Sequence, residues 1–547
     1  MIAARFGRWC RPALGMLIAL LLAACTGTDP SRSTERSPTS GGAARQGGAM
    51  TVAVTADAVS FHPYKTTDAA SRDYQSLVYA NGLLSRDPHN PDNFIPELAE
   101  SWSLAEDRVT YTFRLRPDIR WSDGQPITSA DFKWTFEQAR RPENAYPYVS
   151  NFDTIAAYEA PDPRTIVVTL KEPLAVGLEN ADAVVPLPKH IWEKLDWNDP
   201  NRNPEIMAPT VVSGPFKLKE WVRDSHAIFV ANDLYFKGRP KLDTYEIRVV
   251  GTPQMAFQKL RAGEVDQASI PPEDYEQAKR LDHITVYEWW PAAATWSYIG
   301  FNLRKPYLQD VTVRRALAHA VDRQLIIDKI QYGLAQPTYS AFTPTCWCYN
   351  PDVPRYDYDP ARARALLAQA GWVPGPDNVL TKDGQRLRLR LLFGPNSNKV
   401  RERIATVVQE EFRKLGVEVE IQGLEWAAFL QAIKSPPFDW DLVVLGWVST
   451  VDPHWMYQVW AEQNIPQLNA GAYVNKRVEE LFKQGAREFD RERRKQIYQE
   501  IQRILAEDVP YIFLTMNKAY TGISNRIGGV EVSPLGIGYN IEQWYVK

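Results

Sequence analysis

The sequence is short of net charge and of cysteine. In its 547 residues, 63 Lys and Arg nearly balance 66 Asp and Glu, which leaves a formal net charge of −3, and there are only four cysteines. Proteins that bind nucleic acid usually carry a basic excess on the binding face. The near-neutral balance therefore argues against a nucleic-acid partner, and the scarcity of cysteine excludes a disulfide-rich scaffold.

The motifs of common catalytic sites are also missing. The sequence contains no G-x-S-x-G, no H-E-x-x-H and no G-x-x-x-x-G-K-[ST], and its seven histidines are scattered singly. Acidic pairs are plentiful, but 66 carboxylates produce such pairs by chance. We therefore predict a binding protein with no cofactor and no metal site, and keep an exported enzyme as an alternative that turnover of a bound ligand would reveal.

Long apolar runs are absent except for one near the N-terminus. Arg5, Arg8 and Arg11 precede the segment PALGMLIALLLAA, which has the length and polarity of a secretory signal peptide and is too short to span a bilayer comfortably. We expect residues 1–24 to be removed on export. The rest of the chain has no other apolar run of nearly twenty residues, so we expect a soluble body.

The cysteine at position 25 ends the apolar run. The residues Leu-Ala-Ala-Cys at positions 22–25 match the bacterial lipobox, in which the cysteine thiol takes a diacylglycerol before cleavage. Each buried methylene of an acyl chain contributes about 0.8 kcal/mol, so two or three chains on Cys25 give stable anchoring. The alternative is an ordinary signal peptide in which the cysteine is incidental.

The residues after Cys25 predict a tether. Residues 25–49 are nearly all Gly, Ser, Thr, Pro, Ala and charged residues, and such a segment cannot bury enough apolar surface to offset its ordering entropy. We therefore expect a protein that is lipid-anchored at the cell envelope and exposed on its extracytoplasmic or periplasmic face.

The last two cysteines, Cys346 and Cys348, flank a tryptophan in the stretch TPTCWCYNP. In an oxidising compartment they could close a small disulfide ring or remain thiols. A metal role is the weakest alternative, because no histidine or second cysteine pair stands nearby to complete four ligands.

The body shows strand and helix patterns in alternation. Hydrophobic residues alternate along residues 109–115, and the Asp123-Gly124 pair predicts a tight turn. A helix should follow, with Thr128 or Ser129 as its cap and Pro142 beyond its end. These patterns predict a mixed α/β fold.

Three further helices are expected. Asp359 should cap one that contains Pro360 in its first turn and ends at Gly371. Another should stop at Gly416 and be followed by a strand over residues 417–421. A third, in DVTVRRALAHAVDR, should pack one face inward and direct two arginines to solvent; its inward residues are Val313, Leu317, Ala320 and Val321, and its outward residues are Arg314 and Arg315.

Several segments, in order, resemble the family 5 extracellular solute-binding proteins, which serve ATP-driven importers of peptides and nickel. The first is PELAESWSLAEDRVTYTFRLRPDIRWSDGQPITSADFKWTFE at residues 96–137. It is followed by SGPFKLKEW, ANDLYFKGRPKLD, AFQKLRAGEVD, GFNLRKPYLQDVTVRRALAHAVDR, YDPARARALLAQAGW and DVPYIFLTMNKAY. The resemblance covers essentially all of residues 50–547. We interpret the stretch WSDGQPITSADF at residues 121–132 as scaffold that touches no ligand.

The resemblance implies a type II (cluster C) periplasmic-binding-protein fold with two lobes, three domains and a hinge between the lobes. Residues 50–82, 205–293 and 520–547 would form domain I, and residues 83–204 domain II, inserted in the first lobe. Residues 294–519 would form domain III, the second lobe. Ligand would enter between open lobes, and the closed form would be recognised by an ABC permease. We expect a monomer.

The resemblance also implies where the ligand binds. In dipeptide- and oligopeptide-binding relatives, an acid three positions after a tryptophan neutralises the peptide ammonium. Here Trp447 is followed at that position by Thr450, and the nearest acid is Asp452. The full set of predicted ligand contacts is Trp447, Thr450, Asp452, Trp455, Trp426, Tyr64 and Asn302.

Ligand identity stays open among three classes. Dipeptide binders place an arginine for the peptide carboxylate where this chain has Pro395 and Asn396, which argues against a short dipeptide. A longer peptide held by main-chain hydrogen bonds is the favoured ligand. An oligosaccharide stacked on tryptophans is the alternative, and nickel or a nickel chelate is less favoured because no histidine cluster is present.

Overall fold

The computed structural model describes residues 46–394 and 399–547. The predicted signal peptide, Cys25 and most of the predicted tether lie outside the described residues, as do Pro395 and Asn396. No helix within the described ranges is both long enough and apolar enough to cross a membrane.

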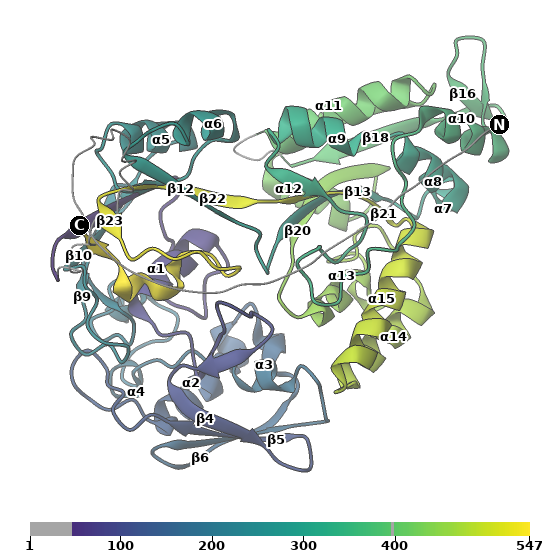
Figure 1. Ribbon diagram of the computed structural model, residues 1–547. Coiled ribbons are helices and arrows are strands. Elements are labelled where there is room, and N and C mark those ends of the chain that lie inside the picture. The colour runs from purple at the N-terminus through teal and green to yellow at the C-terminus, as the bar shows by residue number, and fades with distance from the viewer. Residues whose placement is uncertain (1–45, 395–398) are drawn as a thin grey trace, which may run out of the picture. The chain divides into compact units, whose positions relative to one another are not determined.

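A seven-stranded sheet is built from segments far apart in the sequence. Its strand order is β12-β22-β11-β1-β10-β9-β8, and β1 runs parallel to both β10 and β11 while the other neighbours are antiparallel. Helix α5 packs on one face and helix α1 lies on the other (Figure 1). The elements are β1 (Ala49–Val54), α1 (Ala69–Val78), β8 (Phe216–Val222), β9 (His226–Ala231), β10 (Thr244–Val249), α5 (Pro253–Arg261), β11 (Gln267–Ala268), α6 (Tyr275–Ala278), β12 (Ile284–Trp289) and β22 (Ala519–Ser524).

A four-stranded antiparallel sheet with the order β4-β5-β7-β6 follows α1 in the sequence. The predicted alternation is confirmed in β5, where Tyr111, Phe113 and Leu115 are buried. Thr128 caps helix α2 and forms a capping box with Asp131, which also confirms the predicted helix start. The elements are β4 (Ala99–Leu104), β5 (Thr110–Leu115), α2 (Ser129–Ala139), β6 (Ile155–Asp162), β7 (Thr165–Leu170), α3 (Gly177–Ala181) and α4 (Lys189–Trp192).

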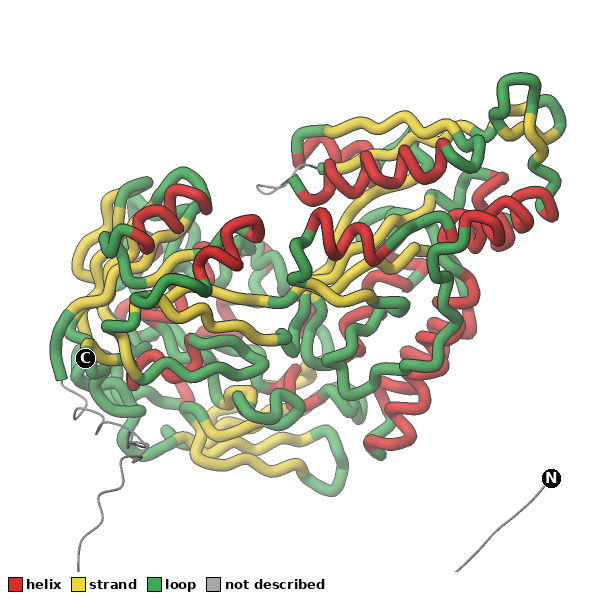
Figure 2. The backbone as a smooth tube through the Cα atoms, turned by 45° about the horizontal axis from the view of Figure 1, so that its top comes forward, coloured by secondary structure: helices red, strands yellow, loops and turns green. Residues whose placement is uncertain are grey.

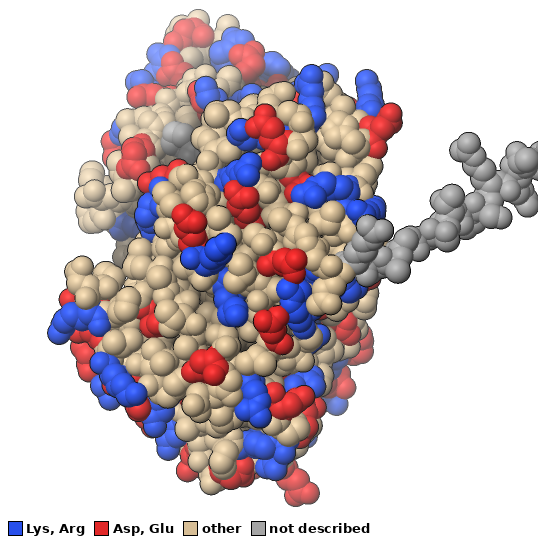
Figure 3. Space-filling model, turned by 90° about the vertical axis from the view of Figure 1, so that its left-hand side faces the viewer, with Lys and Arg blue, Asp and Glu red and all other residues tan. Residues whose placement is uncertain are grey.

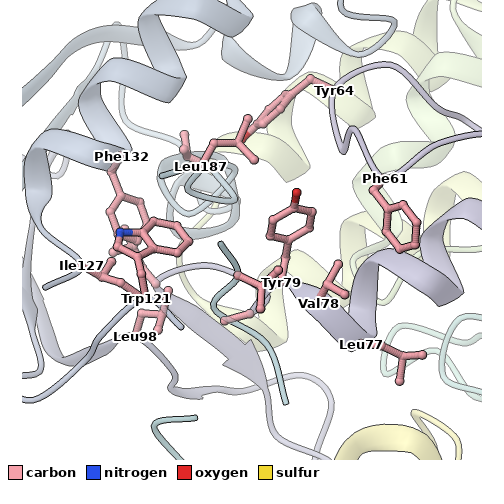
Figure 4. Close-up of a cluster of buried hydrophobic side chains, with 14 of the residues drawn as sticks. Phe61, Tyr64, Leu77, Val78, Tyr79, Leu98, Trp121, Ile127, Phe132 and Leu187 are labelled. Atoms are coloured by element: carbon pink, nitrogen blue, oxygen red, sulfur yellow. The ribbon is translucent and has the colours of Figure 1, made fainter. Parts of the chain in front are cut away.

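One hydrophobic core joins these two sheets. It runs from residues such as Phe61 and Leu77, beside the seven-stranded sheet, to Trp121 and Phe132 beside the four-stranded sheet (Figure 4). Tyr79 and Leu187 lie between the two groups in the same close-up. The two sheets therefore stabilise each other through shared burial of apolar side chains.

A six-stranded mixed sheet with the order β14-β21-β13-β20-β18-β19 organises the other large part of the chain. Alternate residues of its strands face two separate cores, one with α8, α10 and α11 and the other with α12 to α15. The elements are β13 (Thr295–Phe301), α8 (Val311–His319), β14 (Ala335–Pro337), α10 (Pro360–Gln369), β18 (Arg388–Phe393), α11 (Val400–Arg413), β19 (Glu418–Gly423), α12 (Trp426–Lys434), β20 (Leu442–Val448), α13 (Tyr457–Trp460), α14 (Lys476–Arg487), α15 (Arg491–Asp508) and β21 (Tyr511–Asn517).

Short elements complete the described chain. The remaining strands are β2 (Leu84–Arg86), β3 (Phe94–Pro96), β15 (Val373–Pro374), β16 (Leu380–Lys382), β17 (Gln385–Arg386), β23 (Ile527–Gly528) and β24 (Tyr545–Val546). The remaining helices are α7 (Pro306–Gln309), α9 (Arg323–Leu325), a π-helical turn η5 (Ile326–Ile330) and the 3₁₀ turns η1 (Pro142–Asn144), η2 (Val149–Phe152), η3 (Pro204–Ile206), η4 (Pro272–Asp274), η6 (Pro453–Met456), η7 (Glu462–Asn464) and η8 (Gly538–Gln543).

Two strand-to-strand connections link the seven-stranded and six-stranded sheets. Strand β12 leads to β13 through residues 290–294, and β21 leads to β22 through Lys518 alone. Figure 2 shows the strands of these sheets in yellow, together with those of the four-stranded sheet. The domain boundaries expected from the resemblance stay a prediction.

Two of the three further helices have the expected ends. Asp359 caps α10, Pro360 opens it, and Gly371 follows it with a φ of +89°. Helix α11 ends before Gly416, and β19 follows it. The sequence therefore located these helix ends from capping residues and glycine alone.

The interpretation of Arg314 as a solvent-facing residue was wrong. In α8, Val313 and Leu317 are buried as expected, but so is Arg314. Its guanidinium donates to the carbonyl oxygens of Asp508 and Val509, each at 3.0 Å, where α15 ends. The last carbonyls of a helix lack partners within the helix, and a cation there is favourable. Arg314 thus serves as the end cap of a distant helix.

Charges of both signs are interspersed over the face shown in Figure 3. This mixture agrees with the near-zero net charge of the chain.

Candidate ligand-binding site

Three parallel strands of the six-stranded sheet end together. Strand β18 runs parallel to both β19 and β20, so the carboxyl ends of all three lie at one edge, which we call the carboxyl edge. Trp447 lies near the end of β20, Thr450 follows that strand, and Trp426 opens α12 after β19. Ligands of open α/β sheets bind outside the carboxyl ends of the strands. The structure therefore brings three of the predicted ligand residues to the carboxyl edge, and their roles as ligand contacts stay predictions.

Aromatic side chains are partly exposed at this edge. Trp447 and Trp455 meet edge to face, with ring centroids 5.7 Å apart and an interplanar angle of 69°. Trp426 is 43% exposed, and the guanidinium carbon of Arg401 lies 5.2 Å from its ring centroid. Burial lowers the pKa of Arg401, which lies in the first turn of α11. The edge thus combines apolar ring surface with a cationic group.

The predicted acid, Asp452, is already paired within the protein. Its two carboxylate oxygens accept hydrogen bonds from the guanidinium of Arg494 at 2.7 and 2.8 Å. It also caps η6 by accepting from the backbone N–H of His454 at 2.8 Å. Burial would raise the pKa of Asp452, but the hydrogen bonds and charge of Arg494 outweigh it and hold that pKa below its ordinary value.

The Asp452–Arg494 pair is itself buried. The side chains are 17% and 9% exposed, and Arg494 also donates to the carbonyl oxygen of Gly485 at 2.7 Å. Thr450 donates from its hydroxyl to the carbonyl oxygen of Asp452 at 2.7 Å. Because its carboxylate already has these partners within the protein, Asp452 stabilises the conformation of the loop after β20.

Two other predicted ligand residues have structural contacts. Tyr64 is buried and donates from its hydroxyl to the carbonyl oxygen of Val185 at 2.7 Å. Asn302 is fully buried and donates to the carbonyl oxygen of Trp440 at 2.9 Å. In this structure neither side chain is accessible to a ligand, and their roles as ligand contacts stay predictions.

The two cysteines of the CWC segment lie close to the Asp452–Arg494 pair. The structure joins Cys346 and Cys348 by a disulfide with a Cα–Cα distance of 5.2 Å. The ring of Trp347 between them lies 4.9 Å from the guanidinium carbon of Arg491 and 5.4 Å from that of Arg494. Trp347, Arg491 and Arg494 line a cavity of about 260 Å³, and its lining also includes Arg86, Asp92, Phe94 and Glu179.

A second cavity lies on the face of the seven-stranded sheet that carries α1. Its volume is about 580 Å³, and we call it the large cavity. Its walls come from β1, β10 and β11, from α1 and from η8, and it includes Thr55 and Ser269, just beyond the carboxyl ends of β1 and β11. The volume lies within the range of about 300–1,000 Å³ found for small-molecule sites.

The charged lining of the large cavity is mostly acidic. It consists of Asp73, Glu97, Glu542 and Lys237. Lys237 pairs with Glu97 at 2.7 Å. Burial raises the pKa of Glu97 against the opposing effect of Lys237. In the described part of the chain, no group of three or more His, Cys, Asp or Glu side chains is placed to hold a metal ion.

Comparison with known proteins identifies the family. Residues 93–466 match the model of the bacterial extracellular solute-binding proteins, family 5. The chain belongs to this family. This solute-binding protein is 30% identical to the oligopeptide-binding protein AppA of Bacillus subtilis over 97% of both chains. It is 26% identical to the dipeptide-binding protein of Escherichia coli over 87% of this chain and 90% of the other.

Solved structures agree on the fold. The structure of Bacillus subtilis AppA in complex with a nonapeptide superposes with a TM-score of 0.78, covering 92% of this chain and 100% of the other at 30% identity. NikZ from Campylobacter jejuni in complex with Ni(L-His) gives a TM-score of 0.77 at 25% identity over 91% and 99%. The predicted α/β, two-lobed type II periplasmic-binding-protein fold is confirmed.

Some residues of the candidate site were missed from the sequence of this solute-binding protein. Arg494 lies 42 positions from Asp452, so no local spacing indicates their pairing. Glu97 and Glu542 meet at the large cavity from opposite ends of the chain. The only sequence signal for Arg401 was its position at the predicted start of a helix.

Proposed function

We propose that this chain is the lipid-anchored, extracytoplasmic substrate-binding component of an ABC importer, and that its ligands are oligopeptides. The observation that supports this most is the likeness to AppA, whose structure holds a nonapeptide and which aligns with this chain over nearly its whole length. Anchoring would occur through Cys25, outside the described residues.

Because Asp452 is paired with Arg494, it supports a peptide ligand whose terminal ammonium is not bound by a carboxylate of this loop. A ligand ammonium that is buried without a counter-charge would be strongly destabilised. Because Arg494 already neutralises Asp452, the loop after β20 offers no unpaired carboxylate for that ammonium. Affinity would come instead from main-chain hydrogen bonds, as in the addition of a strand, and from the ring surfaces of Trp447, Trp455 and Trp426.

Capture would use a closing movement of the two lobes. The predicted second lobe touches the predicted domain II through few, mostly exposed contacts. Arg487 binds Glu172 at 2.6 Å, and the backbone N–H of Ala175 donates to the carbonyl oxygen of Ala486 at 2.7 Å. Exposed ion pairs contribute at most about 1 kcal/mol each, so such contacts can break and re-form as ligand enters and leaves.

The test is mass spectrometry of the small molecules released when the protein, purified from an exporting host, is denatured. We expect a family of peptides of varied sequence and similar length. Masses spaced by hexose units would instead make the protein an oligosaccharide binder, and release of nickel with a chelating ligand would make it a metal-chelate binder.

A matched variant makes this test sharper. Replacing Trp447 and Trp455 together by alanine should abolish co-purification of the ligand without preventing folding. If the double variant retains the ligand in full, the carboxyl edge is not the binding surface and the proposal fails in its structural part.

A further inference from the structure

We propose that the large cavity is a subsite for a cationic group of the ligand, an ammonium or a guanidinium, with Glu542 as its principal counter-charge. The inference rests on the proposed function, because it names the kind of peptide that the protein prefers.

The central observation is Glu542, a largely buried residue that lines the large cavity and whose carboxylate has no partner among the described residues. Glu542 lies in η8 with 9% of its surface exposed, and it lines the large cavity. In the described residues no side chain or backbone group forms a hydrogen bond or ion pair with its carboxylate. A buried carboxylate normally has a cationic or hydrogen-bonding partner. The cavity beside Glu542 is the space from which a partner could come.

The other charged side chains of the cavity leave it with an excess of negative charge, which favours binding of a cation. Lys237 is the one basic residue of the lining, and it is paired with Glu97. Glu542 lies close enough to Glu97 for its like charge to add to the rise in the pKa of Glu97 that burial causes. Asp73 of α1 also lines the cavity, although this residue is exposed to solvent. The lining of the cavity therefore contains three acidic side chains and one lysine.

The shape of the cavity fits an extended cationic group. Tyr235, Tyr245 and Tyr539 lie in the lining, so an aliphatic stem would meet ring surface while its charged end meets carboxylates. The volume of about 580 Å³ exceeds the needs of a single ion. A lysine or arginine side chain of a peptide, or the peptide's own terminal ammonium, has the matching chemistry.

The experiment measures the binding of synthetic nonapeptide pools to the purified full chain by titration calorimetry. One pool contains a single Lys or Arg in each peptide, and its partner pool carries norleucine or citrulline instead. Each pool is made with a free and with an acetylated N-terminus. We expect a loss of about tenfold in affinity when the cation is removed. Loss on side-chain replacement identifies a basic side chain as the occupant, and loss on acetylation identifies the terminal ammonium.

The isosteric variant Glu542→Gln assigns the effect to the cavity. It should reduce the tenfold preference to less than about threefold. Glu106→Gln is the matched control, because it removes one exposed charge from a residue that does not line the cavity. This variant should keep the tenfold preference for cationic peptides. The inference is overturned if the four pools bind equally well to the unaltered protein, or if Glu542→Gln discriminates as well as the control does.

A second measurement separates this inference from the proposed function. Agmatine, which carries a guanidinium and an ammonium, should raise the melting temperature of the unaltered protein but not that of Glu542→Gln. If no pool binds but agmatine protects in this way, the cation subsite stands and the peptide function fails. If pools bind without preference for charge, the function stands and the subsite fails. If neither probe binds, both are overturned.

Discussion

Replacing Asp452 by asparagine tests whether its carboxylate serves the fold or the ligand. The change removes the charge and one of two strong acceptors while it keeps the size of the side chain. Arg494, 9% exposed in its side chain, would then keep a buried charge without its counter-charge. Breaking a buried ion pair by removing one partner costs about 3–5 kcal/mol. We expect Asp452→Asn to lose about that much free energy of unfolding at pH 7.

The assay is urea denaturation of ligand-free protein followed by tryptophan fluorescence. Glu410→Gln is the matched control, because Glu410 pairs with Arg413 at 2.8 Å on an exposed helix surface. An exposed pair contributes at most about 1 kcal/mol. The difference between the two variants therefore measures what burial adds to the Asp452–Arg494 pair.

The pH dependence gives a second readout for the same pair. Because the folded-state pKa of Asp452 lies below that of the unfolded chain, its stabilisation is complete above the unfolded value, about 3.9, and is lost as pH falls through the folded value. The gap between Asp452→Asn and the unaltered protein should therefore narrow only below about pH 4. If Asp452→Asn unfolds like the control yet loses ligand affinity, Asp452 is a ligand residue and the structural account is refuted.

The remaining predictions concern the ligand surface, the anchor and one buried histidine. Trp447→Ala and Trp455→Ala should each weaken peptide binding by about tenfold and leave the melting temperature of ligand-free protein within a few degrees; failure of both to fold would make these rings core residues. Cys25→Ser should move the protein from the membrane fraction to the soluble exported fraction, and continued membrane retention would refute the lipobox assignment. Burial lowers the pKa of His62 to about 3, so protonation of the unfolded chain should destabilise the fold as pH falls below about 6.5. Between pH 7 and 5 this amounts to about 2 kcal/mol, and a His62→Phe variant should show a correspondingly flatter stability profile.

Local features of the fold were predictable from the sequence because local residues determine them. Thr128, Asp359 and Gly416 mark helix ends through capping and through the tolerance of glycine for positive φ, and each lies where the sequence indicated. The alternating residues of β5 could be assigned in the same way. The family resemblance supplied the global fold, which the comparison with solved structures confirms.

Arg314 is a residue whose environment could not be predicted from the local sequence. On the pattern of α8 alone, an arginine beside the apolar face is most simply placed in solvent. Its actual partners are carbonyl oxygens at the end of α15, nearly two hundred positions away in the sequence. The sequence of α8 carries no signal for a helix end that tertiary packing brings to it.

The same limit explains why the two candidate ligand surfaces were not equally predictable. The carboxyl edge depends on short segments, each following a strand, and the family resemblance indicated Trp447 and Trp426 within those segments. The large cavity depends on η8, α1 and residue 97 meeting on one sheet, and its carboxylates are far apart in the chain. An acid without a local partner is indistinguishable, in a sequence with 66 acids, from one that faces solvent. Burial together with the lack of a protein partner separates Glu542 from the other described acids, and both are properties of the assembled fold.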